Sequence, residues 1–205
     1  MKFGAKKGIG FDISDTAILE AEKLKAISNM NVEFYRTNIL DIDDTFNNSI
    51  DFIYISEGSL LWFSSLDDYF RIISKLLKIE GRVLIYEMHP FTNFFILSNE
   101  MGVEPTLDNF SSYFEKSPYS AKNGLDYIGQ TKYEAKECFS YMHTISDILN
   151  AIIINGIDIE KMEEYNFGCG IEFTENIKTE NREKIPLSYI ISGKKKLKKA
   201  ASTLL

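Results

Sequence analysis

The sequence GIGFDIS, residues 8–14, predicts a β-strand that ends in an acidic residue and leads into a helix. Its β-branched and aromatic residues favour an extended strand, Asp12 stands at the end of the run, and Ser14 is a preferred helix-capping residue. A carboxylate at the end of a parallel strand commonly holds the ribose hydroxyls of a nucleotide cofactor. In such folds a glycine-rich turn lies about 20 residues earlier. Here only eleven residues precede Asp12, so the place of that turn is in question.

Outward from this stretch, short β-like runs alternate with helical periods, which is typical of an α/β fold with a mainly parallel sheet. We predict strands in the first half at Gly8–Ile13, Asn31–Tyr35, Ile50–Ser56 and Arg82–Met88. Apolar residues at the helical period predict one helix after Ser14, with one face formed by Ala17, Ile18, Ala21 and Leu24. They predict a second helix from about Asp67 to Lys78, which Glu80-Gly81 should end.

The second half differs, because periodicity fades and aromatic residues are dense between Phe91 and His143. A connection of this length is usually functional, so we expect a lid or insert over residues 91–143. Thr144–Asp147 fits a capping box ahead of a helix that Gly156 ends. Further strands are predicted at about Ile157–Tyr165 and Leu187–Ser192. Since no linker or repeat divides the chain, we expect a single domain over residues 1–205, with a basic tail over residues 194–205.

Composition excludes several classes of function. The net charge of −7 makes nucleic acid an unexpected partner, because phosphate binding needs a basic face. The lysine run after residue 193 is interpreted as a solvated terminus. Two histidines and two cysteines, with no CxxC or HExxH pattern, argue against a metal site. No secretory segment and no membrane-spanning apolar stretch is found, so we expect a cytoplasmic protein without membrane contact.

Taken in order, six segments resemble the class I S-adenosylmethionine-dependent methyltransferases, particularly those that act on small molecules. The segments are GAKKGIGFDIS (4–14), VEFYRTNILDI (32–42), IDFIYISEGSLLWF (50–63), LLKIEGRVLIYEMHPF (76–91), SYMHTISDILNAIIINGIDIEKMEEY (140–165) and IPLSYIISGKK (185–195). The resemblance implies a Rossmann-like sheet, mostly parallel with an antiparallel last strand. It also implies S-adenosylmethionine as cofactor and methyl transfer to a small-molecule substrate.

The resemblance also answers the question about the glycine turn. In the family, a first strand ends in a glycine-rich turn that wraps the methionine part of the cofactor, and a helix follows. Gly8 and Gly10 lie inside the segment that resembles the second strand, and Ile13 stands where a third glycine would be needed. We therefore expect the first strand, its turn and its helix to be missing. Since the family's first strand is central, its loss would expose an unpaired edge, a candidate contact between copies of the chain.

The resemblance assigns cofactor contacts to the ends of three strands: Asp12 and Ile13 at the ribose, Asn38 and Ile39 at the adenine, and Ser56, Glu57 and Gly58 at the sulfonium and substrate. A carboxylate can accept both ribose hydroxyls. The family usually has an acid where Asn38 stands, although an amide oxygen can still accept a hydrogen bond. The residues alone leave the alternative that Asp12 and Asn38 only form turns.

Two residues at the end of the predicted strand Arg82–Met88 are candidates for catalysis. Glu87 and His89 would face the substrate, where a general base could remove a proton from the methyl acceptor. Methyl transfer to a good nucleophile can also proceed by positioning alone. His143 is a weaker candidate, because it directly precedes the predicted cap at Thr144.

Two classes of function remain open. The first is methyl transfer from S-adenosylmethionine to a small molecule, impaired by the missing segment. The alternative is a catalytically inactive methyltransferase remnant or a protein-interaction module. The absent glycine turn separates them, because it normally supplies the backbone donors that hold the cofactor's methionine end.

Overall fold

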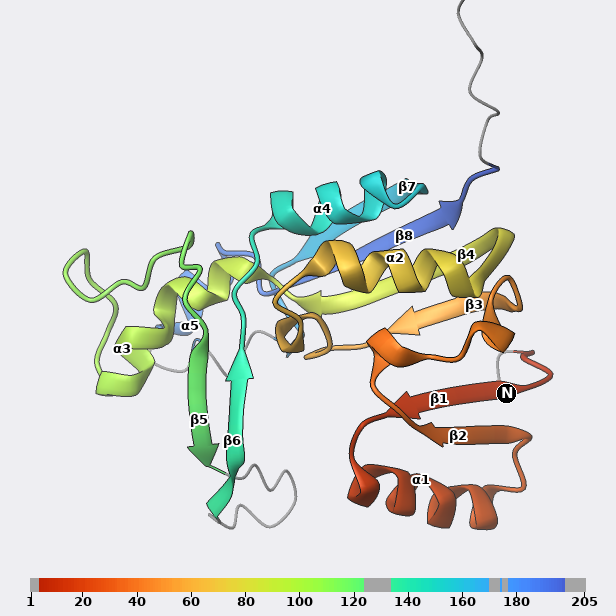
Figure 1. Ribbon diagram of the computed structural model, residues 1–205. Helices are drawn as coiled ribbons and strands as arrows, with labels where there is room; N and C mark the ends of the chain where they lie inside the picture. Colours follow the sequence, from red (N-terminus) through yellow and green to blue (C-terminus); the bar gives the residue numbers. More distant parts are fainter. Residues whose placement is uncertain (1–3, 124–133, 170–173, 175–176, 198–205) are drawn as a thin grey trace, which may run out of the picture.

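The structure is a computed structural model that describes residues 4–123, 134–169, 174 and 177–197 (Figure 1). Its strands are β1 Gly8–Asp12, β2 Val32–Arg36, β3 Ile50–Ile55, β4 Leu77–Met88, β5 Tyr119–Asn123, β6 Glu134–Ser140, β7 Ile157–Tyr165 and β8 Ser188–Lys195. The α-helices are α1 Asp15–Ser28, α2 Leu66–Leu76, α3 Ile96–Met101, α4 Ile145–Ile154 and α5 Thr179–Arg182. Short 3-10 turns are η1 Ile39–Asp41, η2 Asp44–Phe46, η3 Leu60–Trp62 and η4 Pro90–Phe95.

The main sheet has the order β3-β4-β8-β7. Strands β3 and β4 are parallel, and β8 runs antiparallel to both β4 and β7. A separate pair, β1 and β2, is also parallel. The predicted α/β fold, mostly parallel with an antiparallel last strand, is therefore confirmed.

The sheet is interrupted between β1 and β3. Among the described strands, β1 pairs with β2, β3 pairs with β4, and β1 and β3 are not hydrogen-bonded to each other. The arrowheads of β1 and β3 point the same way (Figure 1). Phe46, after β2, contacts the β1–β2 pair. The centroid of its ring lies 5.2 Å from the ring centroid of Phe11 and 5.2 Å from that of Tyr35. The interruption falls at the position that the resemblance gives to the family's first strand.

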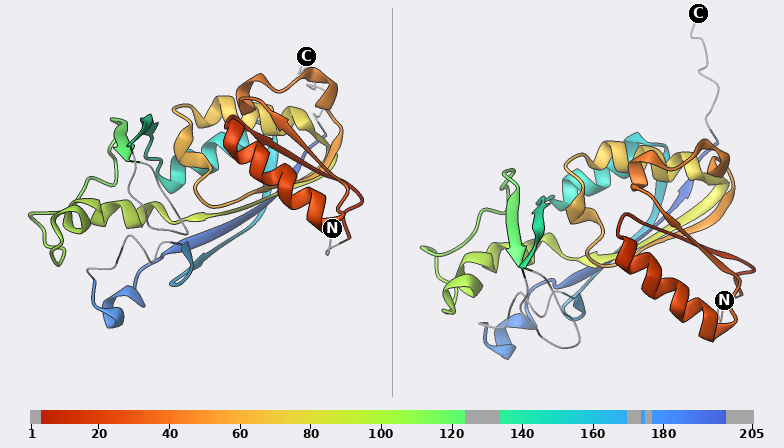
Figure 2. Two further views of the ribbon diagram at one scale, coloured as in Figure 1. Left: turned by 90° about the horizontal axis from the view of Figure 1, so that it is seen from below. Right: turned by 60° about the horizontal axis from the view of Figure 1, so that its bottom comes forward.

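The core lies on one face of the main sheet, where α2 and α4 pack together (Figure 2). On β4, Val83 and Ile85 point into this core and are buried. The opposite face of β3 carries Phe52 and Tyr54, which are 54% and 55% exposed. Burial of apolar side chains therefore stabilises the α2–α4 face much more than the other face.

Helix α1 begins as predicted, since the Ser14 hydroxyl accepts a hydrogen bond from the Ala17 N–H at 3.2 Å. The predicted buried face is only partly formed, because Leu24 is 68% exposed and none of the helix residues is buried. Helix α1 packs mainly on the narrow β1–β2 pair, and two strands do not offer enough surface to cover its apolar side chains.

The prediction that Glu80-Gly81 ends the second helix is wrong. Helix α2 ends at Leu76, where the carbonyls of Lys75 and Leu76 accept hydrogen bonds from Asn48 and Ser49. Strand β4 begins at once with Leu77, which is fully buried. Glu80 has a φ of 68°, and the β3–β4 register shifts at this point. The pair therefore forms an irregularity inside a strand, and Gly81 is needed there because a Cβ would lie only 2.8 Å from the Lys78 carbonyl oxygen.

The aromatic segment contains elements that the sequence pattern did not predict. Residues 90–101 form η4 and α3, and β5 and β6 form an antiparallel hairpin. Residues 124–133 lie outside the described part of the chain. A lid over residues 91–143 stays a prediction, although the segment has an ordered framework.

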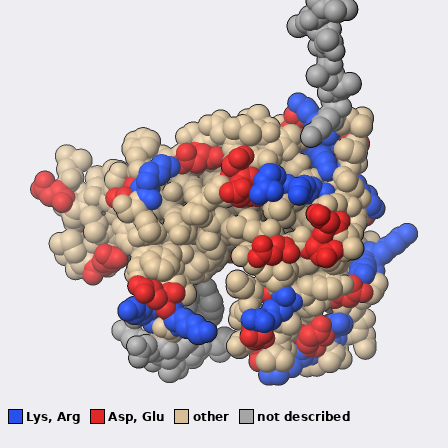
Figure 3. Space-filling model, viewed as in Figure 1, with Lys and Arg blue, Asp and Glu red and all other residues tan. Residues whose placement is uncertain are grey.

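The first lysines of the predicted tail belong to the fold. Lys194 and Lys195 are the last residues of β8, and Lys195 Nζ donates to the Leu77 carbonyl at 2.7 Å. Lys194 pairs with Glu80. Lys198 and Lys199 lie outside the described residues. Acidic and basic side chains are interspersed on the face in Figure 3. In the part of the chain that the structure describes, no helix is long and apolar enough to cross a membrane.

Candidate functional site

The predicted cofactor residues gather at one edge of the fold. Asp12 ends β1, Asn38 follows β2, the loop Ser56–Gly58 follows β3, and Glu87 lies near the end of β4. These strands point the same way, so their carboxyl ends meet on one side of the molecule (Figure 1). In open α/β sheets this side is where ligands bind.

Asp12 is exposed and serves partly as a turn residue. Its Oδ1 accepts a hydrogen bond from the Ser14 N–H at 2.7 Å, and its backbone carbonyl accepts from Thr37 N–H at 2.9 Å. No described residue donates a hydrogen bond to Oδ2 of Asp12. The turn that the residues alone suggested is present, and one carboxylate oxygen remains for a ligand. Ile13 beside it is largely exposed.

Asn38 caps the 3-10 turn after β2. Its Oδ1 accepts from the Leu40 N–H at 3.0 Å, while Ile39 packs against the main core. The amide oxygen that was predicted to accept from an adenine therefore has a local partner. A contact with adenine stays a prediction for both Asn38 and Ile39.

Glu87 holds the loop that follows β3. Its carboxylate accepts hydrogen bonds from the N–H groups of Gly58 at 2.6 Å, Ser59 at 2.9 Å and Leu60 at 3.1 Å. Burial raises the pKa of Glu87, and these amide donors act in the opposite direction. Gly58 has a φ of 77°, which favours glycine. Since both carboxylate oxygens are engaged, Glu87 positions the loop, and its role as a general base stays a prediction.

His89 is also engaged on both ring nitrogens. Nδ1 accepts from the Phe91 N–H at 3.0 Å, and Nε2 lies 2.8 Å from Oε1 of Glu164. Because Nδ1 accepts, we place the proton on Nε2, which donates to Glu164. Burial lowers the pKa of His89, against the opposing effect of Glu164. The neutral ring therefore stabilises the start of η4 through its hydrogen bond with Phe91. A role of His89 as general base stays a prediction.

A cavity of about 190 Å³ adjoins the Glu87 loop. It lies between the ends of β3 and β4, residues 90–96 and residues 140–143. Its lining residues include Leu60, Ile96, His143, Ile148 and Tyr189. Such largely apolar cavities with a few polar groups are typical of small-molecule sites. Tyr189 also belongs to the buried core, as an aromatic residue in a strand pattern normally indicates.

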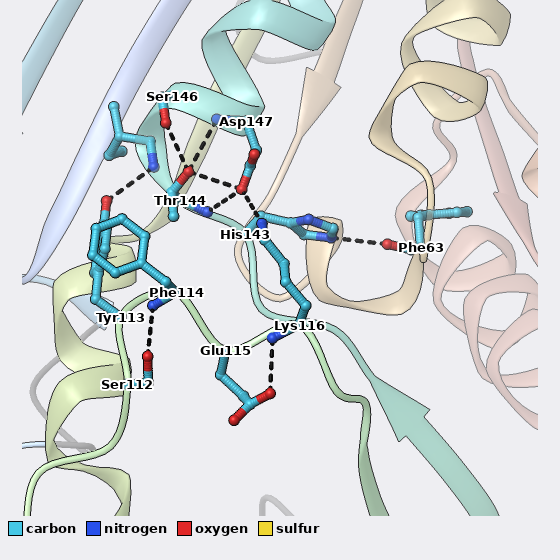
Figure 4. A network of polar contacts seen from close by, with 11 residues as sticks. Phe63, Ser112, Tyr113, Phe114, Glu115, Lys116, His143, Thr144, Ser146 and Asp147 are labelled. Atoms are coloured by element: carbon cyan, nitrogen blue, oxygen red, sulfur yellow. Dashed lines mark hydrogen bonds and ion pairs between the residues drawn. The ribbon is translucent and has the colours of Figure 1, made fainter.

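A second, wider cavity of about 390 Å³ lies at the start of α4. Figure 4 shows the contacts between residues 112–116 and the start of this helix. Thr144 and Asp147 form the predicted capping box, and Lys116 Nζ lies 2.6 Å from Oδ2 of Asp147. The Ile145 N–H donates to the Tyr113 hydroxyl at 3.0 Å. Residues 112–116 therefore contact the start of α4 at two points, through Tyr113 and Lys116.

The Asp147 carboxylate should make stability depend on acidity. Burial alone would raise its pKa, but Lys116 and Thr144 hold the pKa at about 2. Because this lies below the ordinary value of 3.8, the stabilisation is present above about pH 4 and is lost as the pH falls toward 2. We expect wild type to lose about 0.5 kcal/mol more than Asp147→Asn between pH 5 and 3, because the Asp147 side chain is 39% exposed and solvent screening reduces the effect to about half.

Urea unfolding across this pH range measures the difference. Asp108→Asn, in the loop after α3, is the matched control and should follow wild type. Equal pH dependence in wild type and Asp147→Asn would contradict the proposed coupling.

Comparisons with known proteins agree with the α/β fold. Residues 2–141 match the family model described as a methyltransferase domain, which covers more than half of the chain. A comparison with curated protein sequences gives no match.

Solved structures share the fold at low sequence identity. A protein from Listeria monocytogenes, assigned as an S-adenosylmethionine-dependent methyltransferase, is 19% identical with a TM-score of 0.65, over 96% of this chain and 83% of its own. A methyltransferase of the same kind from Mesorhizobium loti is 18% identical with a TM-score of 0.63, over 95% and 82%. The geranyl diphosphate C-methyltransferase from Streptomyces coelicolor A3(2) is 12% identical with a TM-score of 0.57, over 92% and 62%.

Proposed function

We propose, since the chain belongs to the methyltransferase domain family, that it binds S-adenosylmethionine and transfers the methyl group to a small-molecule acceptor. The observation that carries the proposal is the gathering of Asp12, Asn38 and the Ser56–Gly58 loop at the carboxyl ends of their strands. Glu87, which holds that loop, lines a cavity of about 190 Å³. Small-molecule transfer is also the activity of the Streptomyces structure with the same fold, which holds geranyl diphosphate.

Asp12 fits the ribose of the cofactor, whereas Asn38 and Ile39 already have local contacts and their place beside the adenine is part of the proposal. Asp12 offers a carboxylate oxygen to the ribose, Ile39 and Asn38 lie at the end of β2 for the adenine, and Ser56–Gly58 would face the sulfonium, with Glu57 in the same loop. When bound, the cofactor supplies a methyl group on a positively charged sulfur. The chain's contribution would be to align the acceptor with that methyl and to exclude water, with residues 91–143 as lid.

The methionine half of the cofactor fits less well. The printed sequence has no glycine-rich turn ahead of β1, and β1 and β3 share no hydrogen bond in the described structure. Backbone N–H groups of such a turn normally hold anionic ligand groups. We therefore infer that the 205 residues by themselves bind S-adenosylmethionine weakly and transfer methyl groups slowly.

The second candidate is an inactive remnant or a protein-interaction module. The observation in its favour is that β1 and β3 each have one edge without a strand partner among the described residues, and such edges are templates for pairing with another chain. Contacts between copies would then run through these edges. Sedimentation at increasing concentration tests this candidate: self-association without any binding of S-adenosylmethionine would favour it over methyl transfer.

Replacing Asp12 tests the cofactor site. Asp12→Asn keeps an oxygen that can accept from the Ser14 N–H but removes the charge and the second acceptor. A hydrogen bond to a charged group is worth about 1.5–3 kcal/mol, so we expect affinity for S-adenosylmethionine to fall about tenfold. Titration followed by NMR can measure weak binding of this kind.

The control is Asp15→Asn, three residues further on, whose carboxylate pairs with Arg36 at the surface. It should leave the affinity unchanged. Equal affinities for wild type and Asp12→Asn would exclude Asp12 from the ribose site.

A further inference from the structure

Two half-buried polar residues line the cavity of about 190 Å³ beside the Glu87 loop. Asn93 lies in η4 and Ser140 ends β6. Neither side chain forms a hydrogen bond with another described residue. The backbone of Asn93 is held in place, because its carbonyl accepts a hydrogen bond from the Ile96 N–H. A ligand with polar hydrogen atoms can therefore donate to the Asn93 amide oxygen without displacing an existing contact.

The cavity also carries a negative charge, which comes from Glu87. Four backbone N–H groups donate to the two Glu87 oxygens at 2.6–3.2 Å, and such donors favour the ionised carboxylate. No Lys or Arg lines the cavity, and no described Lys or Arg pairs with Glu87. Since both oxygens are engaged, Glu87 acts on a ligand through its charge and not through a hydrogen bond.

The effect of this charge extends to other residues around the cavity. Burial, with the Glu87 charge as the next cause, raises the pKa of Tyr189 and of Tyr69. Burial lowers the pKa of His143, so this lining residue adds no compensating charge at neutral pH. The apolar walls keep the local dielectric constant low, which strengthens the interaction with a ligand charge. The cavity therefore favours a positively charged ligand over an anionic one.

We propose that this cavity binds an apolar molecule that carries a primary or secondary amine, and that Asn93 accepts a hydrogen bond from the amine nitrogen while the Glu87 charge selects the amine. This rests on the proposed function, because the amine would be the methyl acceptor. A cavity of about 150 Å³ admits benzene, so about 190 Å³ suits one ring with a short amine-bearing substituent. Asn93 is then a specificity-determining residue.

An amine also meets the chemical requirement of methyl transfer. The bound ammonium first releases one proton to water, which leaves a lone pair on nitrogen. The nitrogen then forms a bond to the methyl carbon, while the carbon–sulfur bond breaks and its electron pair stays on sulfur. The product is again an ammonium ion. A phenol, in contrast, reacts as its anion, which the Glu87 charge disfavours.

Three probes with the same number of non-hydrogen atoms test the inference: benzylamine, benzyl alcohol and ethylbenzene. Only benzylamine is positively charged at neutral pH, so wild type should bind it about fivefold more tightly than benzyl alcohol. Asn93→Leu should lower the affinity for benzylamine about fivefold, because the amide acceptor is lost. The affinity for ethylbenzene should stay the same or increase. Titration of the labelled full chain without cofactor, followed by NMR, gives these values.

Asn181→Leu, at an exposed position of α5 outside the cavity, is the matched control and should change none of the three affinities. Thermal unfolding checks that Asn93→Leu folds. Asn93→Asp keeps the size of the side chain and adds a negative charge, so it should raise the affinity for benzylamine.

The proposal is overturned if wild type binds benzylamine no more tightly than benzyl alcohol, if Asn93→Leu weakens ethylbenzene as much as benzylamine, or if Asn93→Asp does not raise the affinity for benzylamine. S-adenosylmethionine is titrated separately. Cofactor binding without the preference for the amine rejects this inference alone, whereas the preference without cofactor binding rejects the proposed function alone.

Discussion

Joining a strand, a glycine-rich turn and a helix to the N-terminus should raise affinity for S-adenosylmethionine at least about tenfold. The added strand would pair with the free edges of β1 and β3 and make one continuous sheet. The turn would add backbone N–H donors for the methionine carboxylate. Each apolar side chain of the added strand, once buried, contributes about 1.5–3 kcal/mol to stability. Titration calorimetry on the extended and original chains measures the gain.

Two matched extensions separate the contributions. One carries the same strand with its turn glycines changed to alanine, and it should stabilise the fold while improving cofactor affinity much less. The other carries a polar strand and should do neither. If the full extension raises the unfolding temperature but leaves the affinity unchanged, the interruption between β1 and β3 is not what limits the cofactor site.

Glu87→Ala should be the most destabilising single substitution in the candidate site, lowering the free energy of unfolding by about 2–4 kcal/mol. The change leaves the N–H groups of Gly58, Ser59 and Leu60 without their acceptor at a buried position. The loop after β3 would lose its fixed conformation, and cofactor affinity would fall with it. Urea unfolding and titration of S-adenosylmethionine measure the two effects.

Glu160→Ala on β7 serves as the control. Its carboxylate pairs with Arg82 at the surface, and exposed pairs contribute about 0–1 kcal/mol. A loss for Glu87→Ala no larger than that for Glu160→Ala would show that the carboxylate does not hold the loop.

Much of the fold could be predicted because its signals are local. Ser14 and Thr144 cap α1 and α4 as expected, since capping depends on residues within one turn. Strand β7 has the predicted bounds, Ile157–Tyr165. The common edge of Asp12 and the Ser56–Gly58 loop follows from the parallel direction of their strands.

The remaining features depend on contacts between distant residues. Glu87 meets the Gly58 loop from 29 positions away, and Lys195 reaches the Leu77 carbonyl from 118 positions away. No local pattern reports such pairs. The unpaired Tyr189 hydroxyl is visible only once the surrounding strands are in place. At Glu80-Gly81 the local signal was real, but tertiary pairing placed it inside a strand.

NMR chemical-shift mapping tests the central claim most directly, because it locates even weak binding. S-adenosylmethionine added to the ¹⁵N-labelled chain should shift the amide signals of Asp12–Ser14, Asn38 and Ser56–Gly58, at the carboxyl ends of β1, β2 and β3. Signals at the opposite ends of the strands, around Gly8, Asn31 and Gly81, should stay in place. Shifts gathered at those opposite ends, with none at Asp12 or Gly58, would contradict the account.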